Sequence, residues 1–201
     1  MKFNPGLHYR RSIRLPEYDY TRSGAYFVTI CTANRECLFG QVLGDEMHVN
    51  ELGAAVLECW EWLSKQYTYV TLDVKILMPN HLHGIIIIDD DLGKGGSRTA
   101  PTMVSKRKPL GRLIGAFKTV STKRINEMCQ TPGAILWQRN YCEHIIRNED
   151  SLNKIRDYIL GNPTGWILDQ ENPDITANRA NRDKAACYEK TFFEELKKLE
   201  L

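Results

Sequence analysis

Two histidines placed two residues apart, His81 and His83, are the side chains of this chain best suited to chemistry, because they precede an aliphatic run at residues 85–88. Side chains alternate between the faces of a β-strand, so both imidazoles would point to one face while Leu82 points into the core. Two neutral imidazoles side by side form half of a metal site, which needs further ligands. On spacing alone, the alternative of surface or hydrogen-bonded core histidines stays open.

A tyrosine and an asparagine in a later segment offer what the histidine pair lacks. Tyr158 and Asn162 are four residues apart in a segment with helical spacing, so they would share one helix face, with Lys154 a turn below Tyr158. The Asn162 carboxamide oxygen could complete a His, His, Asn set around a divalent cation and bring the tyrosine hydroxyl beside the metal. Such a tyrosine can attack a metal-polarised phosphate and form a covalent phosphotyrosine. Alternatively, Tyr158 is only an amphipathic residue of a half-buried helix, and Asn162 with Pro163 is only a helix stop.

The positive charge of the chain is concentrated in two stretches although the net charge is only +2. Residues 1–24 contain five basic against two acidic residues, and residues 92–124 contain nine basic residues and no acidic one. After Tyr141 the balance reverses to twelve acidic against nine basic residues. A basic run is often a solvated face, yet this distribution favours a surface that meets a polyanion.

Composition narrows the class of protein. A chain of 201 residues that is 42% hydrophobic and 26% charged predicts one globular domain with an appendage. No segment approaches the roughly 20 apolar residues that cross a bilayer, and the N-terminus does not resemble a secretory signal. The six cysteines form no C-x-x-C pair, which favours a reduced compartment without structural zinc. We therefore expect a cytoplasmic protein with no membrane partner.

The apolar patterns predict an alternation of strands and helices. Strands are expected at residues 25–32, 70–78, 81–88 and 134–146. One helix should begin after Asn50, a second at Leu110 beyond a flexible loop at residues 89–109, and a third at Asn148 or Glu149, ending near residues 161–163. A further helix is expected at residues 184–199, in a tail whose place in the fold the sequence does not give.

This order predicts an α+β protein with the ferredoxin-like β-α-β-β-α-β arrangement, an antiparallel sheet with helices on one face. The expected organisation is a basic N-terminal arm at residues 1–24, a core at residues 25–168 and a polar and helical C-terminal extension at residues 169–201. The third predicted helix follows the last strand and carries Tyr158.

Three ordered blocks then carry a resemblance to a known family. They are residues 78–84 (MPNHLHG), residues 137–148 (WQRNYCEHIIRN) and residues 157–163 (DYILGNP). The chain resembles the REP-associated tyrosine transposases, a branch of the single-tyrosine HUH transposases of the insertion-sequence-200-like group. The resemblance extends from Tyr18 to about Leu168, so residues 25–168 would be the HUH transposase domain.

The resemblance implies a site and a reaction. His81 and His83 would bind Mg²⁺ or Mn²⁺ together with Asn162, and Leu82 would occupy the bulky hydrophobic position. Tyr158 would attack single-stranded DNA, leaving a 5′-phosphotyrosine and a free 3′-OH. Tyr141 is an alternative nucleophile, although it lies in a predicted strand and has no ligand partner four residues on.

The resemblance also implies a partner, namely single-stranded DNA folded as a hairpin of a repetitive extragenic palindrome. Basic side chains of the arm, the loop and the second helix are the candidates for phosphate contact: Arg10, Arg11, Arg14, Lys106, Arg107, Lys108, Arg112 and Lys118. A monomer and a homodimer both stay open, because the tyrosine helix of related transposases can pack on its own subunit or be exchanged.

Two other functions remain possible at this stage. One is a non-catalytic nucleic-acid-binding protein with a ferredoxin-like sheet. The other is a metal-dependent phosphodiesterase that uses water, which would need acidic ligands near the histidines; the aspartates at residues 89–91 are too far along the strand to serve.

Overall fold

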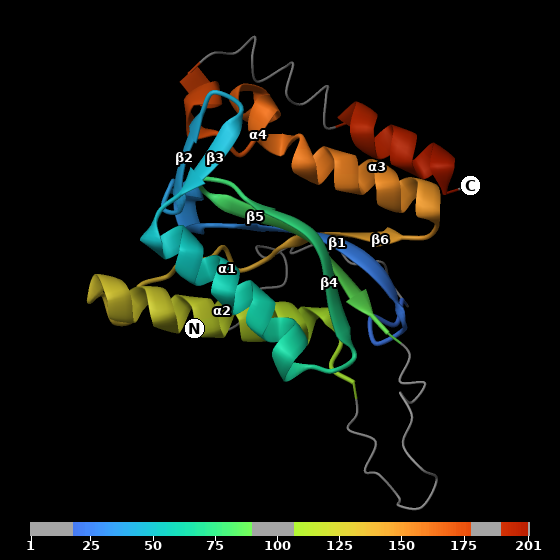
Figure 1. Ribbon diagram of the computed structural model, residues 1–201, viewed down its shortest axis with the longest axis horizontal. Helices are drawn as coiled ribbons and strands as arrows, with labels where there is room; N and C mark the ends of the chain where they lie inside the picture. The colour runs from blue at the N-terminus through green and yellow to red at the C-terminus, as the bar shows by residue number, and fades with distance from the viewer. Residues whose placement is uncertain (1–17, 90–106, 178–189, 201) are drawn as a thin grey trace, which may run out of the picture.

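The computed structural model describes residues 18–89, 107–177 and 190–200. Four strands form one antiparallel sheet in the order β4-β5-β1-β6 (Figure 1). They are β1 (Gly24–Cys31), β4 (Val70–Leu77), β5 (His81–Ile88) and β6 (Cys142–Ile146). With the helix α1 between β1 and β4 and the helix α2 between β5 and β6, this is the predicted ferredoxin-like arrangement, which is confirmed.

One face of the sheet is covered by α1 (Glu51–Gln66) and α2 (Leu110–Cys129) (Figure 1). Asn50 caps α1 as predicted, since its side-chain oxygen accepts a hydrogen bond of 2.9 Å from the Gly53 backbone N–H. The main core lies here and contains the fully buried Trp60, Phe117 and Leu82. Because Leu82 points to this face, the neighbouring histidines point to the opposite one.

The opposite face is covered by α3 (Glu149–Leu160) and by a helix at residues 190–199 (Figure 1). Asn148 caps α3 by accepting a hydrogen bond of 2.8 Å from the Ser151 N–H. Ile155 of α3, Ile85 of the sheet and Leu196 of the last helix form a second, smaller core. The structure thus places the tail helix, which the sequence left without a position.

The structure corrects one predicted strand and adds a hairpin that the sequence analysis did not predict. The strand predicted at residues 134–146 begins only at Cys142, because Trp137 makes a single bridge to Thr32 and its indole N–H donates to Ser121 Oγ of α2 at 2.8 Å. A hairpin of β2 (Gly40–Leu43) and β3 (Glu46–Val49) was missed, since its strands are short and largely exposed.

The third predicted helix ends at Leu160, with Gly161 as its C-cap, close to the predicted end at residues 161–163. The chain then continues as the separate short helix α4 (Asn162–Gly165) and the 3₁₀ turn η2 (Trp166–Leu168). Proline is tolerated there because it stands in the first turn of the new helix. The remaining 3₁₀ turns are η1 (Ala33–Arg35) and η3 (Pro173–Ala177). None of the helices among the described residues is long and apolar enough to span a membrane.

Gly84 gives a test of this packing, because it lets α1 approach the strand that carries the histidines. A Cβ at Gly84 would lie 2.6 Å from Cζ2 of the fully buried Trp60. We expect Gly84→Ala to lower the free energy of unfolding by about 1–3 kcal/mol, measured by urea denaturation. Gly115→Ala in α2 is the control, since a Cβ there meets no atom within 4 Å. It should raise stability by up to about 1 kcal/mol, and equal effects of the two substitutions would contradict the packing described.

Candidate active site

The paired histidines stand at the first and third positions of β5, on the face covered by α3. The register of β5 against β1 sets Cys31 opposite His81 and Thr29 opposite His83. Both imidazoles are buried, and their Nε2 atoms lie 3.1 Å apart. Two ring nitrogens therefore converge on one point.

The hydrogen bonds of Asn80 determine which nitrogen of His81 carries the proton. The Asn80 amide nitrogen donates to the backbone oxygens of Arg35 (3.1 Å) and Glu171 (2.6 Å), so its oxygen faces His81. That oxygen lies 2.9 Å from His81 Nδ1 and can only accept a hydrogen bond. The neutral His81 ring therefore carries its proton on Nδ1 and presents a lone pair on Nε2.

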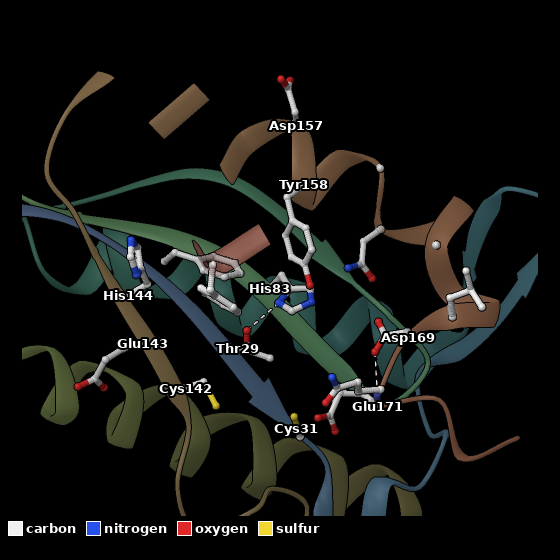
Figure 2. Close-up of a pocket in the computed structure, with 17 residues that line it drawn as sticks. Thr29, Cys31, His83, Cys142, Glu143, His144, Asp157, Tyr158, Asp169 and Glu171 are labelled. Atoms are coloured by element: carbon white, nitrogen blue, oxygen red, sulfur yellow. Dashed lines mark hydrogen bonds between the residues drawn. The ribbon is translucent and has the colours of Figure 1, made fainter. Parts of the chain in front are cut away.

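A hydrogen bond also holds the His83 ring, since the Thr29 hydroxyl, which can donate or accept, lies 2.8 Å from His83 Nδ1 (Figure 2). Burial lowers the pKa of the His81 imidazole to about 3 and lowers that of His83 well below its usual range. Both rings are therefore neutral at physiological pH. Neutral imidazoles, each held by a hydrogen bond at the other ring nitrogen, are typical of metal ligands.

Tyr158 projects from α3 toward the histidines, with its hydroxyl directed at His83 (Figure 2). Its ring meets the His83 ring edge to face, with 5.5 Å between centroids. Phe192 of the tail helix stacks on the Tyr158 ring at 4.2 Å, and Phe27 of β1 contacts it edge to face at 6.0 Å. Three aromatic neighbours thus fix the direction of the phenol.

Asn162 is the first residue of α4 and is 7% exposed. Its amide contacts His81, where it favours the protonated ring, an effect smaller than that of burial. The Asn162 Oδ1 atom is buried and accepts no hydrogen bond from the residues that the structure describes. A buried oxygen without a donor is costly unless a cation binds it, so this atom fits the predicted role as a ligand.

Asp169 is a member of this group that sequence reasoning missed. Its Oδ2 lies 3.6 Å from His81 Nε2, and the ligand atoms of Asp169, His81 and His83 all lie within 4.8 Å of one another. Burial raises the pKa of the Asp169 carboxyl to about 6, against the opposing effects of the Glu171 backbone N–H and Arg35. Asp169 belongs to an irregular segment with no periodic pattern, so the sequence offered no signal that it reaches the strand.

A cavity of about 250 Å³ opens beside these residues (Figure 2). Its walls include Thr29, His83, Tyr158, Asn162 and Asp169. Two ring nitrogens, an amide oxygen and a carboxylate are a donor set suited to a divalent cation such as Mn²⁺ or Mg²⁺. A tyrosine hydroxyl at the same cavity could attack a group held there.

None of the predicted phosphate-contacting residues that the structure describes lines this cavity. Arg10, Arg11, Arg14 and Lys106 lie outside the described residues. Arg107, Lys108, Arg112 and Lys118 lie in or beside α2, which covers the other face of the sheet.

Two of these lysines make contacts within the protein. The Lys118 ammonium donates to the backbone oxygens of Gln138 and Asn140, each at 2.8 Å, and burial lowers its pKa to about 8. Lys108 Nζ donates to the Tyr67 hydroxyl at 3.2 Å. Tyr141, the alternative nucleophile, packs near Lys118 and the main core rather than at the histidines. Phosphate contact by the basic residues stays a prediction.

Two proteins of Haemophilus influenzae are similar to this chain in sequence. An uncharacterised protein of Haemophilus influenzae is 41% identical over 175 residues, 84% of this chain and 96% of its own. A second protein of that bacterium, named "Putative REP-associated tyrosine transposase", is 27% identical over 145 residues, 72% of this chain and 73% of its own. No protein-family model matches the chain.

A solved structure of a REP-associated tyrosine transposase bound to a REP hairpin shares the fold, with a TM-score of 0.52 and 17% identity. The match covers 79% of this chain and 77% of that one. The likeness concerns the fold, a ferredoxin-like sheet with helices on both faces. The chain is therefore similar in sequence and in fold to REP-associated tyrosine transposases.

The buried histidines predict an acid-sensitive fold when metal is kept away by a chelator. Only the unfolded chain can protonate His81 between pH 6.5 and about 3, so stability should fall as pH falls through this window. Each such histidine contributes about 1.4 kcal/mol per pH unit. Asp169 has the opposite effect on stability, because its carboxyl pKa is raised from the ordinary 3.8 to about 6 in the folded protein. Between these pH values the folded protein holds the extra proton, so this group alone makes stability rise as pH falls.

Urea denaturation at pH values from 7.5 to 4.5 would measure how steeply the free energy of unfolding depends on pH. Stability should decline below pH 6.5, and His81→Gln should make the decline shallower by about one proton per molecule. A wild-type stability that is flat across this range would contradict neutral, buried histidines.

Proposed function

We propose that the chain is a transposase-type endonuclease and strand transferase that cleaves single-stranded DNA beside a hairpin through a 5′-phosphotyrosine at Tyr158. The observation that supports this most is the direction of the Tyr158 hydroxyl, which points at His83 across a cavity that also receives Asn162. The similarity to REP-associated tyrosine transposases supports a transposase, and the hairpin in the related solved structure suggests the form of the DNA.

The reaction follows from the groups at the cavity. The Tyr158 oxygen attacks the phosphorus of the scissile phosphate and loses its proton to solvent, while the bond to the 3′ oxygen breaks and that oxygen takes up a proton. The 5′ end remains on the tyrosine. Attack by a 3′-OH on the phosphotyrosine reverses these changes and joins strands.

His81, His83 and Asn162 would hold the metal ion. When bound, Mg²⁺ or Mn²⁺ would polarise the phosphate as a Lewis acid. Asn80 and Thr29 hold the two imidazoles so that their Nε2 atoms lie 3.1 Å apart. The aromatic contacts of Tyr158 hold the nucleophile in place, so little ordering remains to be done when DNA binds.

A metal-dependent phosphodiesterase that uses water is the second candidate, because Asp169 lies beside the histidines. This function needs an acidic ligand near the histidines, and the sequence analysis found none close enough to serve. The two mechanisms differ in their intermediates, since only the tyrosine mechanism leaves DNA covalently attached to the protein. A non-catalytic nucleic-acid-binding protein would give neither cleavage nor adduct.

Tyr158→Phe is the decisive substitution. With a labelled single-stranded hairpin substrate and Mn²⁺, the wild-type chain should form a protein–DNA adduct visible after denaturing electrophoresis, and Tyr158→Phe should form none while still binding the DNA. Only the attacking oxygen is removed, so the loss should be complete. Tyr141→Phe is the matched control and should keep the adduct.

The same assay tests the form of the DNA. The same sequence as a full duplex should give little or no adduct, because a second strand keeps the bases stacked and paired. Adduct formation by Tyr158→Phe, or cleavage by the wild type without any adduct, would contradict the tyrosine mechanism.

A further inference from the structure

The ligand set of the proposed function lacks negative charge. His81 and His83 are neutral imidazoles, and Asn162 offers a neutral amide. Mg²⁺ and Mn²⁺ are hard cations that proteins usually hold with at least one carboxylate. One further group is therefore expected at the site.

The position of Asp169 meets this expectation. Its Oδ2 is 3.6 Å from His81 Nε2, although that nitrogen carries a lone pair and has no proton to donate. Two electron-rich atoms thus face one another without a hydrogen bond between them. Ligand atoms about 2.1 Å from one ion and at right angles lie about 3 Å apart, and the His81–His83 and His81–Asp169 separations are of this order.

A network of hydrogen bonds holds the carboxylate in this direction. Its other oxygen, Oδ1, accepts the Glu171 backbone N–H at 2.7 Å, which turns Oδ2 toward the histidines. The Glu171 backbone oxygen accepts the Asn80 amide at 2.6 Å, and the Arg35 guanidinium pairs with the Glu171 side chain at 3.0 Å. Asn80 therefore orients His81 through its oxygen and the Asp169 segment through its nitrogen.

We infer that Asp169 is the charged ligand of the divalent cation, and that Asn80 is a positioning residue that fixes it together with His81. The inference rests on the proposed function, since it concerns the same metal. The buried Asn162 Oδ1, which has no donor among the described residues, points to a ligand at this place independently of Asp169.

Mn²⁺ binding to the metal-free full chain, measured by isothermal titration calorimetry without DNA, tests the inference. Asp169→Asn keeps the acceptor for the Glu171 N–H and removes only the charge. Its Mn²⁺ affinity should fall by at least about tenfold, since even residues behind the ligands are worth on the order of 10- to 100-fold. Asp174→Asn, at an exposed carboxylate five residues on, is the control and should bind as the wild type does.

The outcomes separate this inference from the proposed function. Unchanged affinity in Asp169→Asn, with affinity lost in His81→Ala, would overturn the role of Asp169 and leave the tyrosine mechanism standing. If the wild type bound no Mn²⁺, both the role of Asp169 and the metal-assisted reaction of the proposed function would be overturned. Cleavage in excess chelator would likewise contradict the metal-assisted reaction.

Asp169→Cys provides a readout that a structural role would not give. A thiolate at this position should bind Cd²⁺ directly and add an ultraviolet thiolate-to-Cd²⁺ absorption band above the background of the wild-type cysteines. The absence of any added band, in a protein whose thermal unfolding matches that of the wild type, would overturn direct ligation.

Discussion

Two buried ring nitrogens, His81 Nε2 and His83 Nε2, lie 3.1 Å apart and are the constraint around which the rest of the site is organised. Taking such nitrogens out of water is costly unless they are hydrogen-bonded or bound to a cation. Asn80 and Thr29 occupy the other ring nitrogens, so His81 and His83 cannot relieve the cost by turning away. The pairing of β5 with β1 sets this geometry, because it places Thr29 directly opposite His83.

The nucleophile depends on the second core as much as on its own helix. Phe192 stacks on Tyr158 from a helix that is distant in sequence, and the Lys154–Glu195 ion pair joins that helix to α3. A further hydrogen bond of 2.7 Å runs from Asn148 at the start of α3 to the Leu199 backbone oxygen. The C-terminal helix is therefore part of the wall that holds the tyrosine.

The sequence predicted the features that depend on local pattern. The alternation around His81, the cap at Asn50 and the helical spacing of Tyr158 and Asn162 are local, and the fold that they imply is confirmed. The features that it missed depend on contacts between distant segments. Contacts with distant residues hold the Asp169 segment beside the strand, among them the hydrogen bond from Asn80 to the Glu171 backbone oxygen, between residues 91 positions apart. The inward direction of the Lys118 side chain likewise depends on a contact with another segment, because its ammonium donates to the Gln138 backbone oxygen.

The protonation of the two imidazoles tests the central claim most directly. Long-range ¹H–¹⁵N correlation spectra of the metal-free chain should show both rings neutral at pH 7, with His81 protonated on Nδ1 and unprotonated on Nε2. Addition of a diamagnetic divalent ion such as Mg²⁺ should shift the Nε2 resonances of both rings. A proton on His81 Nε2, or spectra that do not change with the ion, would contradict a site built to bind metal.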